Sequence, residues 1–327
     1  MNTALKITAF TAALAAAFGT AYGVGNAVDP VATEPAPAAH ADHGAGAGHE
    51  DDAPGRGGGE GGHGEAQAGG LQISEGGYTL DLDTSRVKAG EETELSFAVR
   101  GEDGRPLTSY RTEHGKQLHL LLASRDLAVY RHLHPKRAAD GSWSIPVNLP
   151  AAGDYRVFAD FAPAVEGAKP LTLGADLAAV GAYEPKGLPE PSRTATVDDY
   201  TVTLDGSLRP GAAATLDLKV ARDGRPVTDL QPYLGAYGHL VALRAGDLAY
   251  LHVHPGGEPG DGATETGPTV SFATTAPSSG SYRLFLDFKH DGKVRTAAFT
   301  VTADGAAKAE EEKGDGGADH EDGAHQH

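Results

Sequence analysis

The sequence predicts an all-β protein made of two tandem immunoglobulin-like β-sandwich domains. Short apolar runs alternate with a period of two residues, which is typical of half-buried strands. Gly, Pro, Asn and Asp turn signals separate these runs, and no convincing amphipathic helix interrupts them. The same order of strands and turns then occurs a second time, which indicates a tandem duplication.

The composition restricts the classes of function. The 327 residues are enough for two ordinary domains with tails. A formal net charge of -18 argues against nucleic acid and anionic membrane surfaces as partners, and it suits the binding of cations. There is no Cys, and Met1 is the only Met, so thiolate and thioether metal ligands are excluded.

Residues 1–27 are predicted to be a signal sequence or a membrane anchor. Lys6 precedes an uncharged, Ala-rich run from Ile7 to Val24, which is long for a cleaved signal and just long enough to span a membrane. The small residues around Ala27 form an acceptable cleavage site, so both outcomes stay open, and we expect the uncleaved anchor. An inward-facing Lys6 would place the domains outside the cell, and cleavage would give a secreted protein.

Two regions, residues 28–70 and 304–327, are predicted to be disordered. Both are rich in Gly, Ala and acidic residues, and neither has enough large apolar side chains to form a core. Both contain histidines, namely His40, His43, His49, His63, His320, His325 and His327. The first region either collects divalent metal weakly or is a solubilising linker that contains His, and both interpretations stay open.

The first sandwich is predicted to span residues 71–183. Its expected strands alternate with period two and are separated by turn sequences. They lie near residues 78–82, 94–99, 119–124, 129–134, 142–147, 155–161 and 171–180.

The second sandwich is predicted to span residues 198–303, after a Pro-rich connector at 184–197. The Asp-Gly-Arg-Pro turn at Asp103 recurs at Asp223, an offset of 120 residues. The strand that starts at Tyr155 recurs at Tyr282, an offset of 127 residues. We place the seven extra residues in the Gly-rich loop after Pro255.

Each repeat contains a predicted β-hairpin that ends in His-x-His-Pro. The hairpins run from His119 to Pro135 and from His239 to Pro255. With two-residue turns, His119 pairs with His132 and His239 pairs with His252. His134 and His254 follow two residues later, on the same face of the sheet. Three imidazoles are therefore expected to converge in each repeat.

Three neutral imidazoles on a rigid hairpin suit Zn(II) or Cu(II), because these ions favour nitrogen donors and accept three protein ligands with water. Each repeat is predicted to bind one such ion, and the second site is expected to be the better one because its flanks are more apolar. Asp160 and Asp287, at equivalent positions of a later strand, are candidate fourth ligands or acceptors that orient an imidazole. The predicted metal-site residues are His119, His132, His134, Asp160, His239, His252, His254 and Asp287. His114 and His290 have no counterpart in the other repeat and are expected at the surface.

The hairpin block from His239 to Pro255 and the block from Gly280 to Phe288 resemble a group of secreted or membrane-anchored bacterial proteins, many from actinobacteria. The resemblance covers both repeats, Tyr78–Val180 and Tyr200–Thr302, and the N-terminal segment. It implies a metal-associated envelope protein, linked to heavy-metal or copper handling. A membrane metal transporter is the candidate partner.

The sequence therefore favours an extracytoplasmic protein that binds Cu(II) or Zn(II) for metal homeostasis. The alternative is a non-catalytic interaction or adhesion module of the cell envelope, in which the histidines only pack. An enzyme is not expected. A three-His site with an open position is the pattern of hydrolytic zinc, but Glu113 has no counterpart, and no GxSxG, HExxH or Gly-rich phosphate loop is present.

Overall fold

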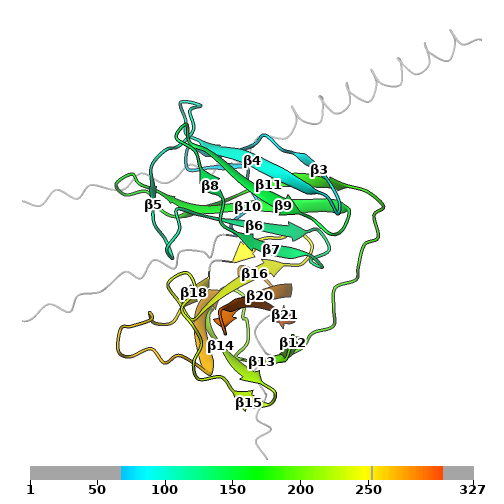
Figure 1. Ribbon diagram of the computed structural model, residues 1–327, viewed down its shortest axis with the longest axis vertical. Coiled ribbons are helices and arrows are strands. Elements are labelled where there is room, and N and C mark those ends of the chain that lie inside the picture. Colours follow the sequence, from blue (N-terminus) through cyan, green and yellow to red (C-terminus); the bar gives the residue numbers. More distant parts are fainter. Residues whose placement is uncertain (1–67, 252, 305–327) are drawn as a thin grey trace, which may run out of the picture. The chain divides into compact units, whose positions relative to one another are not determined.

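The computed structural model describes residues 68–251 and 253–304, and this part of the chain contains 21 strands and no helix (Figure 1). The predicted all-β class is confirmed. The described residues include no helix that is long and apolar enough to cross a membrane. The predicted anchor, nearly all of the linker and tail, and His252 lie outside the described residues.

The first repeat consists of two sheets. The first sheet has the order β1 (Ser74–Glu75), β2 (Tyr78–Leu82), β4 (Glu92–Arg100), β9 (Ser142–Asn148) and β8 (Lys136–Arg137). The second sheet has the order β3 (Arg86–Lys88), β11 (Leu171–Val180), β10 (Gly153–Pro163), β6 (Leu118–Ser124) and β7 (Tyr130–Leu133), and β5 (Tyr110–Arg111) pairs with β10. All these pairs are antiparallel except the parallel pair of β3 and β11.

The second repeat has the same plan. One sheet has the order β12 (Thr194–Val197), β13 (Tyr200–Asp205), β14 (Ala213–Arg222), β19 (Thr269–Thr275) and β18 (Val253–Pro255), and β15 (Arg225–Pro226) pairs with β14. The other has the order β17 (Tyr250–Leu251), β16 (Gly238–Arg244), β20 (Gly280–His290) and β21 (Lys293–Ala303). Strand β12 pairs with β13, so the second repeat begins four residues earlier than position 198, inside the predicted connector.

The packing is that of an immunoglobulin-like sandwich. Alternate residues of the two facing sheets fill each core, as the period-two pattern predicts. The Tyr155 hydroxyl donates to the carbonyl of Ala151 at 2.8 Å, and the Tyr282 hydroxyl donates to that of Ser278 at 2.8 Å. Both are tyrosine corners, which are characteristic of this architecture.

The seven-residue difference between the repeats lies in the predicted loop. In the first repeat β9 starts seven positions after Pro135, and in the second repeat β19 starts fourteen positions after Pro255. In both repeats the chain passes from one sheet to the other at the His-x-His-Pro segment, since β7 and β8 belong to different sheets, as do β17 and β18. The motif therefore marks a crossing between sheets.

The outer faces of β6, β7 and β10 in the first repeat and of β16, β17 and β20 in the second share one buried apolar cluster. Its buried members are Leu121, Ala123, Leu127, Tyr130, Phe158, Val241, Leu243, Leu248, Tyr250 and Phe285. Tyr130 stacks on Phe285 with ring centroids 4.1 Å apart, and the equivalent pair, Tyr250 and Phe158, lies 6.1 Å apart. The two repeats thus pack face to face with approximate two-fold symmetry.

The segment at Gly69 and Gly70 also joins the two repeats. Gly69 exchanges two backbone hydrogen bonds with Tyr250, at 3.0 and 2.9 Å, and the Arg156 guanidinium donates to the Gly70 carbonyl at 3.0 and 2.9 Å. Gly70 has a φ of +72°, and a Cβ atom at this position would overlap the Phe158 ring. This close approach requires glycine.

Gly70→Ala should therefore lower the free energy of unfolding by about 1–3 kcal/mol, because left-handed strain adds to a steric clash. Urea unfolding, followed by the fluorescence of Trp143, the only Trp, measures the change. Gly104→Ala is the matched control, because Gly104 has a φ of +73° and nothing within 4 Å of an added Cβ. Equal losses in the two variants would contradict the steric account.

Candidate metal centre

The first hairpin brings its three histidines to one face in a register that differs from the predicted one. Leu121, not His119, pairs with His132. The turn is longer than two residues, because the Ser124 amide donates to the Val129 carbonyl at 2.9 Å and Leu127 has a φ of 57°. A shift of two residues leaves every side chain on its predicted face. The predicted register is therefore wrong, but the prediction that the three histidines share one face is correct.

The cluster of His119, His132 and His134 is compact. One ring nitrogen of each lies within 4.8 Å of the other two. The ring centroids are 5.3, 5.2 and 5.0 Å apart, a nearly equilateral triangle. The His119 Nδ1 and the His132 Nε2 are 3.1 Å apart. Two nitrogen ligands of a tetrahedral zinc ion lie about 3.3 Å apart when each Zn–N bond is about 2.0–2.1 Å.

The partners of these rings determine where their hydrogens lie. The His119 Nε2 is 3.1 Å from the Glu113 carbonyl, so this nitrogen carries a hydrogen and donates it. The His132 Nδ1 is 2.9 Å from the Asp287 carboxylate, so it also donates. If both rings are neutral, the two remaining nitrogens, which face each other at 3.1 Å, both carry lone pairs. A positive centre, either a proton or a metal ion, is therefore needed between these two lone pairs.

The third ring, that of His134, also has a nitrogen that needs a partner. The His134 Nε2 is buried and has no hydrogen-bond partner. A buried polar atom without a partner costs free energy, so its presence needs an explanation. A metal ion shared with the two other rings would give this nitrogen a partner.

Burial lowers the pKa values of several imidazoles in and around the cluster. Desolvation, assisted by the proximity of His132, lowers the pKa of His119 to about 3 and that of His134 to about 3. Desolvation also lowers the pKa of His239 to about 4. Neutral imidazole is the form that binds metal ions, so these three rings are in the binding form at neutral pH.

A pocket of about 60 Å³ adjoins the cluster and is lined by residues of both repeats. Its lining includes His119 and His132 from the first repeat and His239, Val241 and Tyr250 from the second. This volume holds a few water molecules. A metal ion bound by three histidines could therefore keep a water ligand on this side.

The second hairpin also has a register that differs from the predicted one. Leu243 pairs with Tyr250, a shift of two residues. His254 lies in β18, opposite Ala273 in the other sheet, and its side chain is exposed. Val253 pairs with Thr274, whereas its equivalent in the first repeat, Leu133, pairs with Leu120 of β6. The predicted site of His239, His252 and His254 includes His252, which lies outside the described residues, so this site stays a prediction.

His239 lies next to the first cluster. Its ring centroid is 6.0 Å from that of His132 and 6.2 Å from that of His119. Its Nε2 donates to the Leu234 carbonyl at 3.0 Å, which repeats the His119–Glu113 contact. Among the described residues, the only group of three or more His, Cys, Asp or Glu with ligand atoms this close is the one in the first repeat.

The two aspartates occupy equivalent positions, and each accepts a hydrogen bond from a threonine of the neighbouring strand. Asp287, at 2% exposed, accepts hydrogen bonds from the His132 Nδ1 at 2.9 Å and the Thr296 hydroxyl at 2.5 Å. Asp160 accepts a hydrogen bond from the Thr172 hydroxyl at 2.9 Å. Asp287 thus orients an imidazole that belongs to the other repeat. The sequence predicted that each aspartate serves the histidines of its own repeat. The face-to-face packing of the repeats instead brings Asp287 to a histidine of the first repeat.

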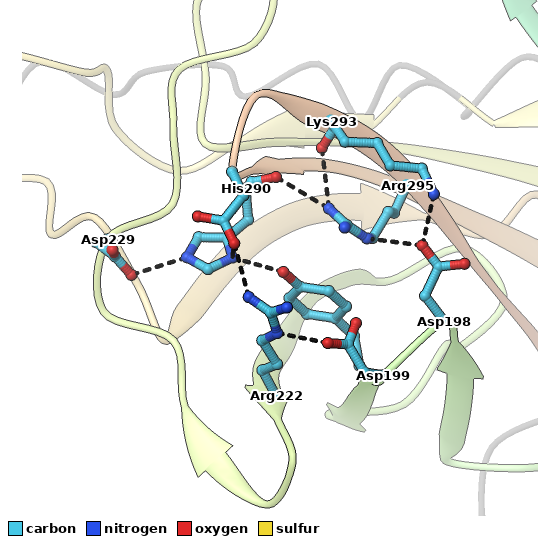
Figure 2. A network of polar contacts seen from close by, with 9 residues as sticks. Asp198, Asp199, Arg222, Asp229, His290, Lys293 and Arg295 are labelled. Carbon is cyan, nitrogen blue, oxygen red and sulfur yellow. Dashed lines mark hydrogen bonds and ion pairs between the residues drawn. The ribbon is translucent and has the colours of Figure 1, made fainter.

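His290 was expected at the surface, and this prediction is wrong. The residue is buried, and it links Tyr200 to Asp229 (Figure 2). The Tyr200 hydroxyl is 2.6 Å from the His290 Nδ1, and the Asp229 carboxylate is 3.0 Å from its Nε2. His290 therefore joins strands of the two sheets of the second repeat. His114 is exposed, as expected, with its ring centroid 5.2 Å from that of His239.

The fold and this cluster define a class of tandem immunoglobulin-like proteins with a partly buried three-His cluster. Residues 72–170 and 195–305 each match the model of one family, which is described as Domain of unknown function (DUF8832). The chain belongs to this family, and it contains two copies of the domain. No curated protein matches the chain.

Several solved structures are similar to the chain. The adhesin FdeC of Escherichia coli is 19% identical, over 72% of this chain and 65% of FdeC, with a TM-score of 0.23. InvD of Yersinia pseudotuberculosis is 12% identical, over 71% of this chain and 59% of InvD, with a TM-score of 0.23. Invasin, a bacterial integrin-binding protein, is 16% identical, over 69% of this chain and 39% of invasin, with a TM-score of 0.20. The chain spans less than two thirds of each of these structures, and TM-scores this low carry no argument about function.

The lowered pKa values predict that acid destabilises the metal-free protein. Between the folded pKa values of about 3 to 4 and the ordinary value of 6.5, the unfolded chain binds more protons at His119, His134 and His239 than the folded chain does. The free energy of unfolding should therefore fall as the pH drops from 6.5 towards 4, by at most about 1.4 kcal/mol per pH unit for each group. Urea unfolding of metal-stripped protein at several pH values measures it. His134→Gln removes one of these groups and should make the dependence shallower, and an unchanged slope would contradict the assignment.

Proposed function

We propose that this protein binds one divalent ion, Zn(II) or Cu(II), through His119, His132 and His134, and serves metal homeostasis outside the cytoplasm. The extracytoplasmic part of the proposal rests on the sequence of residues 1–27. The metal part rests on the geometry of the cluster. The proposal concerns the first repeat, because the second predicted site includes His252, which lies outside the described residues.

A single observation carries the proposal. Three contacts, from His119 to Glu113, from His132 to Asp287, and between the two rings, need three N–H hydrogens. Two neutral imidazoles have only two. Without a metal ion, the contact between the two rings would need one additional hydrogen. A divalent ion would replace this proton and would also give the His134 Nε2 a partner.

The kind of donor favours Zn(II) or Cu(II) over other ions. The cluster offers nitrogen ligands alone, whereas Mg(II) and Ca(II) prefer oxygen. The chain has no Cys, and its only Met is Met1, so soft sulfur ligands for Cu(I) are lacking. The hydrogen bond from His132 to Asp287 is the carboxylate–histidine arrangement that commonly supports a metal-bound imidazole.

Protein of residues 68–304, which lacks the His-containing tails, should bind one equivalent of Zn(II) or Cu(II) with high affinity. Calorimetric titration and elemental analysis after dialysis measure the stoichiometry. His134→Ala should abolish this tight binding, because two ligands remain. His254→Ala is the matched control and should keep one equivalent, because His254 lies in another sheet.

If the unaltered protein binds no metal ion tightly, the metal proposal is wrong and the alternative of an interaction module is favoured. Two equivalents, of which His254→Ala removes one, would restore the second site that the sequence predicts.

Metal binding should also release about one proton at pH 7.5, because the ion replaces the proton held between His119 and His132. Titrations in buffers with different ionisation enthalpies give the number of protons released. The same titrations on His134→Ala supply the background from weak binding. If the unaltered protein releases no proton, the two rings are neutral without metal. This result would contradict the need for a third N–H hydrogen in the contacts of His119 and His132.

A further inference from the structure

We infer that metal binding at His119, His132 and His134 is coupled to the docking of the two repeats, and that Asp287 of the second repeat is the positioning residue that transmits this coupling. The inference rests on the proposed function and adds the regulation of the same site. It follows from where the cluster lies. All three ligands come from the first repeat, but the groups that orient and bury them come in part from the second.

The contact from His132 to Asp287 is the most direct link. The side chains are 6% and 3% exposed, so neither group has water as an alternative partner. Asp287 lies in the middle of β20, and the Thr296 hydroxyl on β21 holds its second oxygen. The carboxylate therefore has a fixed position on the sheet of the second repeat. It directs the His132 Nε2 towards His119, which is the orientation that metal binding needs.

The stack of Tyr130 on Phe285 is adjacent to this contact on both strands. Tyr130 and His132 are two positions apart on β7, and Phe285 and Asp287 are two positions apart on β20. Side chains two positions apart on a strand share a face, so the stack and the hydrogen bond belong to one continuous interface. The ring centroids are 4.1 Å apart and the rings are nearly parallel, at 5°. Separation of the repeats at the stack would also separate the carboxylate from the imidazole.

The second repeat also keeps the cluster out of water. The rings of His239 and Tyr250 and the side chain of Val241 line the adjoining pocket. If the repeats separated, these groups would leave and the three ligands would become hydrated. The ordered, dry arrangement of the ligands thus exists only in the docked state.

Linkage makes the effect reciprocal. If the docked state binds the ion more tightly by some factor, the ion favours docking over separation by the same factor. Metal binding therefore stabilises the docked state of the two repeats, although none of the three ligands belongs to the second repeat. This predicts protection at places in the second repeat that the ion does not touch.

Hydrogen exchange of the full chain, measured with and without saturating Zn(II), tests this prediction. The ion should slow the exchange of amides in β16 and β20 as well as in β6 and β7. Asp287→Asn should lower the affinity of the tight site by about 10–100-fold. At saturating Zn(II), this variant should retain the protection of β6 and β7 and lose that of β16 and β20. Each measurement is repeated on the same protein with His134→Ala added, where only weak binding, such as that of the tail histidines, remains. The binding of the tight site is the difference between the two measurements.

Asp291→Asn is the matched control. It makes the same chemical change in the same repeat, at a residue that pairs with Arg222, and asparagine tolerates its φ of 50°. It should bind and protect like the unaltered protein. Phe285→Leu, a milder change to the stack, should lower the affinity several-fold, although Phe285 is not one of the three proposed ligands.

Each outcome has a distinct meaning. If the unaltered protein binds no tight Zn(II), the proposed function fails. If it binds one equivalent and protects β6 and β7 but not β16 and β20, the coupling is wrong and the proposed function stands. An unchanged affinity in Asp287→Asn, or loss of protection in Asp291→Asn to the same extent, would also overturn the role of Asp287.

Discussion

The hydrogen bond between the Asp287 carboxylate and the His132 imidazole is the interaction on which the arrangement of the site depends. A carboxylate that is 2% exposed must be paired, because an isolated buried charge is costly. Its pairing fixes which nitrogen of His132 carries hydrogen, and this determines what the facing nitrogen of His119 meets. The shortage of hydrogens between the two rings is thus a consequence of a contact made by the other repeat.

Burial of the outer faces of the two sheets makes this chemistry possible. In a solitary sandwich, the face that carries His119, Leu121 and Ala123 would be open to water, and imidazoles there would titrate near 6.5. Here the second repeat covers this face, and desolvation lowers the pKa values of His119 and His134 to about 3. The same apolar contacts that join the repeats therefore keep the histidines available to a metal ion.

The sequence predicted the fold well because period-two alternation and a repeated order of turns are local signals. It also predicted that His119, His132 and His134 share a face, since a pairing error of two residues leaves side-chain direction unchanged. It could not locate the point where the chain leaves the sheet. Leu133 pairs with Leu120 of β6, whereas its equivalent Val253 pairs with Thr274 of the other sheet. The partner of Asp287 was also beyond its reach, because no local pattern encodes how two sandwiches face each other.

The duplicated motif yields unequal surroundings because a tandem pair cannot be fully symmetric. The interface has an approximate two-fold axis, seen in the pairs of Tyr130 with Phe285 and of Tyr250 with Phe158. The covalent chain breaks this symmetry. Gly69 pairs with the backbone of Tyr250 on one side, whereas Leu188 of the connector packs against the shared apolar cluster. The two hairpins therefore have partly different neighbours. In the first repeat, Asp287 and His239 of the second copy orient and surround the three-His cluster.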